Sequence, residues 1–467
     1  MRGLGAGTLA IVALIATGAL AQDGKVITKQ YDDGGVYEGT FKDGKQHGTG
    51  TYRLPNGYVY EGAWVDGEIL GEGRAEFPNG SVYEGNFVAG KPEGPGKITF
   101  ADGGTYEGDW LDGKINGQGS AQYANGVRYT GGFENALHHG QGRMESPNGY
   151  IYDGTWVRGI KEGEGTITYP DGAVYAGTLV RGVREGKGTL TMPDGLVYEG
   201  DWAKGQIHGT GTLTQPNGDI YEGTLENGKR QGAGKVTYAN GDVYEGDFAD
   251  DQRHGQGTFT GTDGYVYTGS WANGSIAGDG TVTYPDGSVY TGTFKDDLAD
   301  GSGKIVYPDG NTYEGQWVSG VIEGTGVATY ANGLVYEGEF KNAKMDGQGK
   351  MTFADGYTYE GGWKDGQRDG VGVARYSDGT VYEGAFVAGQ REGEGTITMP
   401  DGFTYTGAWK GGEIDGKGVA TYANGDVYDG TFVRGKRQGE GTIRYASGEE
   451  RSGTWEDGVL TDDASGN

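Results

Sequence analysis

The sequence predicts an all-β protein, an elongated and twisted single-layer antiparallel β-meander built of hairpins. Two observations support this prediction. A tyrosine and four glycines recur at fixed offsets every 23 residues from Tyr37 to Tyr428, eighteen times without an insertion or deletion. Within each unit apolar and polar side chains alternate, which is the period of a β-strand. So strict a period predicts a stacked array in which each unit needs its neighbours.

The first residues have the features of a cleavable secretory signal. Met1 and Arg2 precede an apolar stretch over 9–16, and 19–21 read Ala-Leu-Ala, a small-x-small cleavage site before Gln22. We therefore expect a signal peptide over 1–21 and an exported protein that is periplasmic, secreted or held at the cell envelope. A retained, uncleaved anchor is the alternative. The following segment, 22–36, is expected to form an N-terminal capping strand.

Each unit of the array over 37–450 is predicted to be one hairpin. In 36–41 the sequence Val-Tyr-Glu-Gly-Thr-Phe places tyrosine, glycine and phenylalanine on one face of an outgoing strand. The return strand is expected over 48–54, joined to the outgoing strand through 42–47. Glycine follows the tyrosine at position +2, in the outgoing strand, at +11 and +13, in the return strand, and at +20, in the connection to the next unit.

The connection between units is expected to be a three-residue hairpin loop. It is clearest where it reads Pro170-Asp171-Gly172, since proline suits the first position of a type I turn and glycine the left-handed position that closes the loop with a bulge. A loop of this length also keeps apolar residues on one face. With a C-terminal capping strand over 451–458 and a disordered tail over 459–467, the chain should contain about 38 strands, two for each of about 18 hairpins plus two single strands.

Composition narrows the possible functions. The chain has no cysteine, which excludes disulfides and thiol chemistry. Its net charge of −28 argues against binding to nucleic acid or to anionic membranes. Partners should be neutral, cationic or bridged by cations. The glycine content would suggest disorder, but 33 Tyr, 13 Phe and 9 Trp at fixed positions indicate a folded array with thin layers.

The unit closely resembles the MORN repeat (membrane occupation and recognition nexus). The resemblance is carried by Tyr-Glu-Gly-x-Trp/Phe-x-x-Gly-x-x-x-Gly-x-Gly, as in residues 198–211, and covers about residues 25 to 458. It implies an array of about 18 hairpins, here of an exported bacterial type, that serves as a scaffold or binding module. In that family catalysis lies in attached domains, and this chain has no room for one.

Alternate repeats differ in a regular way. All nine tryptophans lie at position +4 in every second repeat, with one slip, and phenylalanine or leucine takes that position between them. Isoleucine accompanies tryptophan near the hairpin tips at residues 69, 115, 207, 276, 322 and 414, where other repeats carry residues such as Gln46 or Arg391. Two interpretations remain open. Either isoleucine covers its own tryptophan, or it forms an intermittent apolar edge for a partner.

No catalytic, cofactor-binding or metal-binding residue is expected. His47, His139, His208 and His254 share one position but lie in separate repeats, so they do not form a ligand set. The Gly-x-Gly elements enter strands and do not open helices, which argues against a phosphate-binding loop. Turn aspartates offer one carboxylate each, too few for calcium.

We therefore expect a non-enzymatic, exported scaffold without cofactors. Its repeated aromatic groove should bind an extended protein segment or a second copy of the chain. The predicted contact residues are Tyr60, Trp64, Tyr106, Trp110, Tyr152, Trp156, Tyr198, Trp202, Tyr267, Trp271, Tyr313, Trp317, Tyr359, Trp363, Tyr405 and Trp409. The alternatives are binding to a glycan or cell-envelope polymer, and association with a phospholipid membrane surface.

Overall fold

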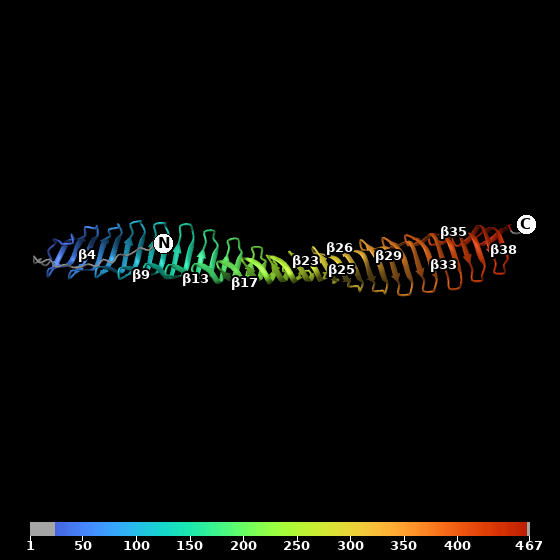
Figure 1. Ribbon diagram of the computed structural model, residues 1–467, viewed down its shortest axis with the longest axis horizontal. Coiled ribbons are helices and arrows are strands. Elements are labelled where there is room, and N and C mark those ends of the chain that lie inside the picture. The colour runs from blue at the N-terminus through green and yellow to red at the C-terminus, as the bar shows by residue number, and fades with distance from the viewer. Residues whose placement is uncertain (1–23, 465–467) are drawn as a thin grey trace. The chain divides into compact units, whose positions relative to one another are not determined.

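The computed structural model describes residues 24–464, and these residues fall into two compact units, 24–229 and 230–464. The expected signal peptide over 1–21 and residues 465–467 of the expected tail lie outside the described residues. Within each unit the strands lie side by side and each pairs with the next in antiparallel orientation (Figure 1). The predicted all-β antiparallel meander is confirmed.

Unit 1 begins with a short single strand, β1 (Ile27–Gln30), which pairs with β2. The outgoing strands of unit 1 have seven residues each and are β2 (Val36–Lys42), β4 (Val59–Val65), β6 (Val82–Val88), β8 (Thr105–Leu111), β10 (Arg128–Glu134), β12 (Ile151–Val157), β14 (Val174–Val180), β16 (Val197–Ala203) and β18 (Ile220–Glu226). The return strands have nine residues each and are β3 (Lys45–Arg53), β5 (Glu68–Glu76), β7 (Lys91–Thr99), β9 (Lys114–Gln122), β11 (Leu137–Glu145), β13 (Ile160–Thr168), β15 (Val183–Thr191) and β17 (Gln206–Thr214).

Unit 2 continues the same pattern. Its outgoing strands are β20 (Val243–Ala249), β22 (Val266–Ala272), β24 (Val289–Lys295), β26 (Thr312–Val318), β28 (Val335–Lys341), β30 (Thr358–Lys364), β32 (Val381–Val387), β34 (Thr404–Lys410), β36 (Val427–Val433) and β38 (Glu450–Glu456). Its return strands are β19 (Lys229–Thr237), which begins at the unit boundary, β21 (Gln252–Thr260), β23 (Ser275–Thr283), β25 (Leu298–Val306), β27 (Val321–Thr329), β29 (Lys344–Thr352), β31 (Gln367–Arg375), β33 (Gln390–Thr398), β35 (Glu413–Thr421), β37 (Lys436–Arg444) and β39 (Val459–Asp463).

The loops between repeats have the predicted form. The N–H of Gly172 donates to the carbonyl of Tyr169, and the N–H of Tyr169 donates to the carbonyl of Ala173. The carboxylate of Asp171 accepts from the N–H of Ala173, and Gly172 has a φ of +91°. These contacts define a type I turn closed by a left-handed glycine, so three residues connect the strands.

The hairpin tips correct the sequence-based prediction. The connection expected over 42–47 is only the two-residue turn Asp43-Gly44, and the return strand begins at Lys45. In the next repeat the tip residues Asp66 and Gly67 have φ values of 51° and 93°, which is typical of a type I′ turn. The extra residues of the return strand form a bulge, where Gly71 has a φ of +103°. The glycine at position +11 therefore marks a bulge inside the return strand.

The C-terminal end also differs from expectation. Residues 459–463, predicted to be disordered, form β39 and pair with β38 after the turn at Asp457-Gly458. The described chain thus has 39 strands, not 38. The physical reason is that Trp455 lies opposite Leu460, so an apolar pair holds the last turn of the array together.

Candidate functional site

The repeat tyrosines and the rings at position +4 form one row on the core face of each unit. Tyr60, for example, makes edge-to-face contacts with Trp64 of its own repeat, at 5.7 Å between ring centres, and with Phe87 of the next, at 5.0 Å. Tyr83 continues the row to Phe87 and Trp110. We call this row the aromatic ladder. Edge-to-face pairs of this kind are favourable beyond the area that they bury.

Hydrogen bonds fix the tyrosine and tryptophan rings of the aromatic ladder. The hydroxyl of every repeat tyrosine donates to the backbone carbonyl three residues later, as Tyr198 does to Asp201 at 2.9 Å. The indole N–H of every tryptophan donates to the carbonyl of a glycine in the preceding return strand, as Trp202 does to Gly188 at 3.0 Å. Burial raises the pKa of Tyr198 to about 12, which keeps its hydroxyl a neutral donor.

The glycines at positions +2 and +13 make room for the tyrosine ring. Gly200 and Gly211 lie opposite each other in adjacent strands, and the ring of Tyr198 lies over both. A Cβ atom on Gly211 would come within 2.5 Å of the Tyr198 Cε2 atom. Since any side chain at this position would clash with the ring, the sequence pattern Tyr-x-Gly and its paired glycine form one packing unit.

The aromatic ladder is the core of the protein and not an open groove. Of the sixteen residues predicted to contact a partner, the eight tyrosines are 0–2% exposed and the eight tryptophans 3–8%. The prediction that these residues contact a partner at the surface is therefore wrong. The structure brings them together, but other side chains cover them. The sequence alone did not reveal the cover, because the covering side chains come from position +9, within the stretch expected to be a loop.

Position +9 covers the aromatic ladder from the tip side. Arg391 lies with its guanidinium carbon 4.3 Å from the centre of the Trp409 ring in the next repeat, and its Nη2 donates to the carbonyl of Gly412 at 2.8 Å. Four other arginines, Arg184, Arg253, Arg368 and Arg437, make the same two kinds of contact, on tryptophan or phenylalanine. Each of these guanidinium groups therefore covers an aromatic ring through a cation–π contact and is held in place by a hydrogen bond.

Isoleucine occupies the same position in most tryptophan repeats. Ile69 lies directly opposite Trp64 in the register of β4 and β5 and is 3% exposed, and Ile276 is likewise buried opposite Trp271. The other four isoleucines are half-buried. These positions favour the packing interpretation over that of an apolar edge for a partner.

Two further repeats carry histidine or lysine at position +9. His138 is buried, stacks on Tyr129 at 3.7 Å between ring centres, and its Nε2 lies 2.7 Å from the hydroxyl of Tyr123. Burial lowers the pKa of His138 to about 4, so the ring is neutral at physiological pH. Burial likewise lowers the pKa of Lys161 to about 8, and its ammonium lies 4.4 Å from the centre of the Tyr150 ring.

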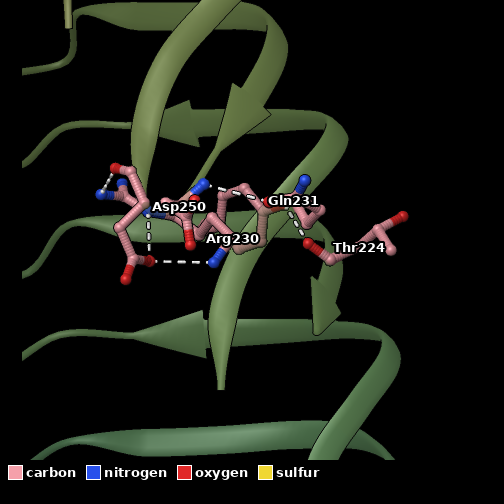
Figure 2. Close-up of polar contacts among 6 residues, drawn as sticks. Thr224, Arg230, Gln231 and Asp250 are labelled. Atoms are coloured by element: carbon pink, nitrogen blue, oxygen red, sulfur yellow. Dashed lines mark hydrogen bonds and ion pairs between the residues drawn. The ribbon is translucent and has the colours of Figure 1, made fainter. Parts of the chain in front are cut away.

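Position +10 connects neighbouring tips. Figure 2 shows Gln231, at position +10, beside the next tip in unit 2, where its amide oxygen accepts from the N–H of Asp250 at 3.0 Å. Arg230, at position +9, donates to the carbonyl of Asp251 at the same tip. His47 is at position +10, and the N–H of Asp66 points at its Nδ1 at 3.4 Å. Within residues 24–464 no group of three His, Cys, Asp or Glu side chains could hold a metal ion.

A second set of rings lies at the loop side of the core face and remains half-exposed. In unit 2 these rings flank the three-residue loops: Phe353 and Tyr357 lie 5.0 Å apart, Tyr357 and Tyr376 also lie 5.0 Å apart, and Phe403 and Tyr422 lie 5.7 Å apart between ring centres. We call these five residues the ring rim. The ring rim adjoins the aromatic ladder through Arg368. Its Nη1 donates a hydrogen bond to the hydroxyl of Tyr357 in the ring rim at 2.6 Å, and its guanidinium covers the Phe386 ring of the aromatic ladder.

The opposite face of the sheet carries paired polar side chains. Across the loops, basic residues at position +14 pair with acidic residues at position +1 of the next repeat, and Lys304 and Glu314 form such an ion pair at 3.2 Å. Hydroxyl groups also pair at these positions, as in the hydrogen bond of 3.0 Å between Thr396 and Thr406. A shallow open trough over β6–β10 is lined by Lys97 and Glu107, which form an ion pair. Such exposed pairs contribute little stability but set the register.

The sequence matches the MORN repeat model at eighteen segments, residues 37–57, 60–82, 83–105, 106–128, 129–149, 152–174, 175–197, 198–220, 221–243, 244–264, 267–289, 290–312, 313–335, 336–356, 359–381, 382–404, 405–427 and 428–450. The chain belongs to the MORN repeat family. MORN repeats are modules for interaction with proteins or membranes, and this array is therefore an interaction module. No curated protein matches the sequence.

This MORN array is also similar, at low identity, to several solved structures. One is the SAS-4 (dCPAP) TCP domain of Drosophila melanogaster, in complex with a proline-rich motif of Ana2 (dSTIL), at 19% identity over 32% of this chain and 82% of that one, with a TM-score of 0.22. Another is the TCP10 domain of Danio rerio CPAP with a STIL peptide, at 17% identity over 58% and 94%, with a TM-score of 0.15. A streptogramin B lyase is 12% identical over 64% and 92%, with a TM-score of 0.11.

Over residues 24–464 the MORN array contains no helix with the length and apolar character needed to cross a bilayer.

Proposed function

We propose that this MORN array is a non-enzymatic scaffold for protein interaction, and that the ring rim is its contact surface. The proposal rests on the observation that the core face has a covered part and a half-exposed part. The aromatic ladder is covered by position +9, whereas Phe353, Tyr357, Tyr376, Phe403 and Tyr422 stay half-exposed beside it. The contact surface is thus shifted from the repeat tyrosines and tryptophans to the rings that flank the loops.

The chemistry of the ring rim supports binding to an extended protein segment. Phenylalanine and tyrosine give large apolar contact areas at a low cost in side-chain entropy, and they are enriched at the energetic centres of interfaces. Contacts with neighbours already restrain these rings, since Tyr357 is held between Phe353, Tyr376 and the guanidinium of Arg368. A partner would therefore meet a partly ordered surface.

The site of action is part of the same proposal. Residues 1–21 read as a cleavable signal, which supports an exported scaffold at the cell envelope. Mass spectrometry of the protein recovered from the envelope fraction tests this directly. A mature terminus at Gln22 is expected, and an intact Met1 terminus on exported protein would remove the claim of cleavage.

The contact surface is tested by affinity capture from an envelope extract. The mature chain is compared with a variant carrying Phe353→Ser and Tyr376→Ser on the ring rim. The matched control carries Lys350→Ser and Glu360→Ser, which lie opposite each other on adjacent strands at the other face of the sheet. We expect the ring-rim variant to lose protein partners that the control retains, with unchanged circular dichroism in both.

Two results would contradict the proposal. Equal capture by the ring-rim variant and the control would show that the ring rim is not the contact surface. Binding to isolated envelope polysaccharide, or to phospholipid vesicles, without any captured protein would favour the glycan or the membrane alternative.

A further inference from the structure

The eighteen repeats carry lysine at position +9 once, at Lys161, and its contacts differ from those of the arginines at that position. Arg184, for example, donates to the carbonyl of Gly205 at the next tip, at 2.6 Å. The single side-chain nitrogen of Lys161 donates instead to the hydroxyl of Tyr150, at 2.5 Å. Tyr150 follows a three-residue loop and directly precedes β12. The amino group of Lys161 therefore lies toward the loop side of the core face.

Three aromatic rings surround the Lys161 nitrogen. Its Nζ lies 4.4 Å from the centre of the Tyr150 ring, 4.9 Å from that of Tyr152 and 5.8 Å from that of Trp156. Tyr152 and Trp156 are buried, whereas Tyr150 and Lys161 itself are half-buried. The nitrogen is therefore enclosed by rings toward the core and is reached by small molecules from the loop side.

No carboxylate holds the Lys161 ammonium. In the described part of the chain Lys161 has no ion-pair partner, and burial lowers its pKa to about 8. The neighbouring carboxylates have other partners, since Glu162 accepts the backbone N–H of Arg181 at the next tip and Glu164 accepts the hydroxyl of Thr178. At pH 7 about one Lys161 amine in ten is therefore neutral, compared with about one in three thousand at the ordinary pKa of 10.5.

Tyr150 is fixed so that its hydroxyl stays beside this nitrogen. Its N–H donates to the side-chain oxygen of Asn148 at 3.1 Å, and its carbonyl accepts from the N–H of Ser146 at 2.8 Å. Its ring packs edge-to-face on Tyr169, at 6.2 Å between ring centres. Burial raises the pKa of Tyr150, so its hydroxyl keeps its proton at physiological pH. A nucleophilic amine and a proton donor are thus held in contact, which is the arrangement that condensation with a carbonyl group requires.

We propose that Lys161 is a nucleophilic amine that captures a small aldehyde as an imine, with the hydroxyl of Tyr150 as its proton-transfer partner. The site suits an uncharged and unhindered carbonyl compound, because aromatic rings border the nitrogen and the side chains around it are only half open to solvent. It is a site of covalent attachment in unit 1. It goes beyond the protein interaction proposed for the ring rim, which lies in unit 2, so each proposal can fail without the other.

The reaction balances without an oxidant or a reductant. The neutral amine of Lys161 adds to the carbonyl carbon, and one of its protons moves to the carbonyl oxygen, which gives a carbinolamine. The hydroxyl of Tyr150 then protonates the carbinolamine oxygen, and the carbon–oxygen bond breaks to release water. The Tyr150 phenolate takes back a proton from the nitrogen. The products are one imine and one water, and Tyr150 is again neutral.

The test measures how fast individual lysines of the full mature chain react with acetaldehyde. Cyanoborohydride reduces each imine to a stable ethylamine, and mass spectrometry of the digested protein locates the adducts over time. The reference is Lys204, an exposed lysine at a hairpin tip of the same unit. At pH 7 we expect Lys161 to be modified at least tenfold faster than Lys204. This ratio should shrink at pH 10, where an ordinary lysine is partly neutral as well.

Two variants define the roles within the site. Tyr150→Phe keeps the ring and removes only the hydroxyl, so it should slow the modification of Lys161 at least threefold and leave Lys204 and the thermal melt unchanged. Lys161→Arg installs the residue that position +9 has in other repeats, so it should keep the fold and lose this adduct alone. Equal rates at Lys161 and Lys204 at pH 7, a ratio that does not shrink at pH 10, or an unchanged Lys161 rate in Tyr150→Phe would each overturn the proposal.

Discussion

The packing of the repeat tyrosine on its paired glycines makes a sharp prediction at Gly211. The backbone there is not left-handed, so only the ring of Tyr198 prevents a side chain. In Gly211→Ala the new Cβ would lie 2.5 Å from Cε2 and 2.7 Å from the hydroxyl oxygen of Tyr198. Because ordinary contacts begin near ~3.4 Å, the ring has to move by about 1 Å.

The cost follows from what that movement disturbs. Tyr198 is 0% exposed, contacts Trp202 at 5.6 Å between ring centres, and donates to Asp201 at 2.9 Å. Overpacking a core typically costs about 1–3 kcal/mol. Loss of the buried hydrogen bond adds about 1 kcal/mol. We expect Gly211→Ala to lower the local free energy of unfolding by about 2–4 kcal/mol.

A double-mutant cycle identifies the cause. Tyr198→Ala alone removes a buried ring and should cost about 3–5 kcal/mol. In that background the methyl group of Gly211→Ala enters emptied space, so its additional cost should be close to zero, a coupling of about 2 kcal/mol or more. The control is Thr212→Ala, whose side chain lies on the opposite face and should cost within about 0.5 kcal/mol.

Hydrogen exchange of the peptides over 197–214 is the suitable assay, because long repeat arrays do not unfold as one cooperative unit. The reasoning is refuted if Gly211→Ala is as mild as Thr212→Ala, or if it costs the same with and without the Tyr198 ring.

Three further predictions concern the cover of the aromatic ladder. Arg391→Ala should lower stability by about 1–2 kcal/mol, through loss of the cation–π contact and of the bond to Gly412, and Arg391→Ile should recover part of it in the same exchange assay. Burial lowers the pKa of His138 from 6.5 to about 4, so the unfolded chain binds a proton at this residue more readily than the folded chain does. Stability should therefore fall as the pH is lowered from 6.5 toward 4, by at most about 1.4 kcal/mol per pH unit. Thermal melts of His138→Leu at the same pH values should lack this component. The third prediction concerns single changes to serine at Ile69, Ile115, Ile276, Ile322 and Ile414. Each change should lower the free energy of unfolding by on the order of 1 kcal/mol and leave the sedimentation of the chain unchanged. A change in association instead would revive the interpretation of these residues as an apolar edge for a partner.

The sequence was sufficient for the fold because its information is local and repeated. Alternation within 36–41 specifies a strand, and Pro170-Asp171-Gly172 specifies a three-residue loop; eighteen copies in one register leave an antiparallel meander as the consistent solution. The tips were misjudged because Asp43-Gly44 was included in a longer connection. A type I′ signal, Asp-Gly between two strands, was present there and could have been recognised.

The candidate site depended on the tertiary structure. Periodicity placed Tyr198 and Trp202 on one face, but it could not tell whether that face was open, because the cover comes from residues such as Arg391 that reach across to the next repeat. Pairing of Lys304 with Glu314 across the loop likewise follows from register and not from spacing alone. A sequence period thus determines which side chains share a face. Whether water or a neighbouring repeat meets that face is decided by contacts between repeats, which exist only in the folded array.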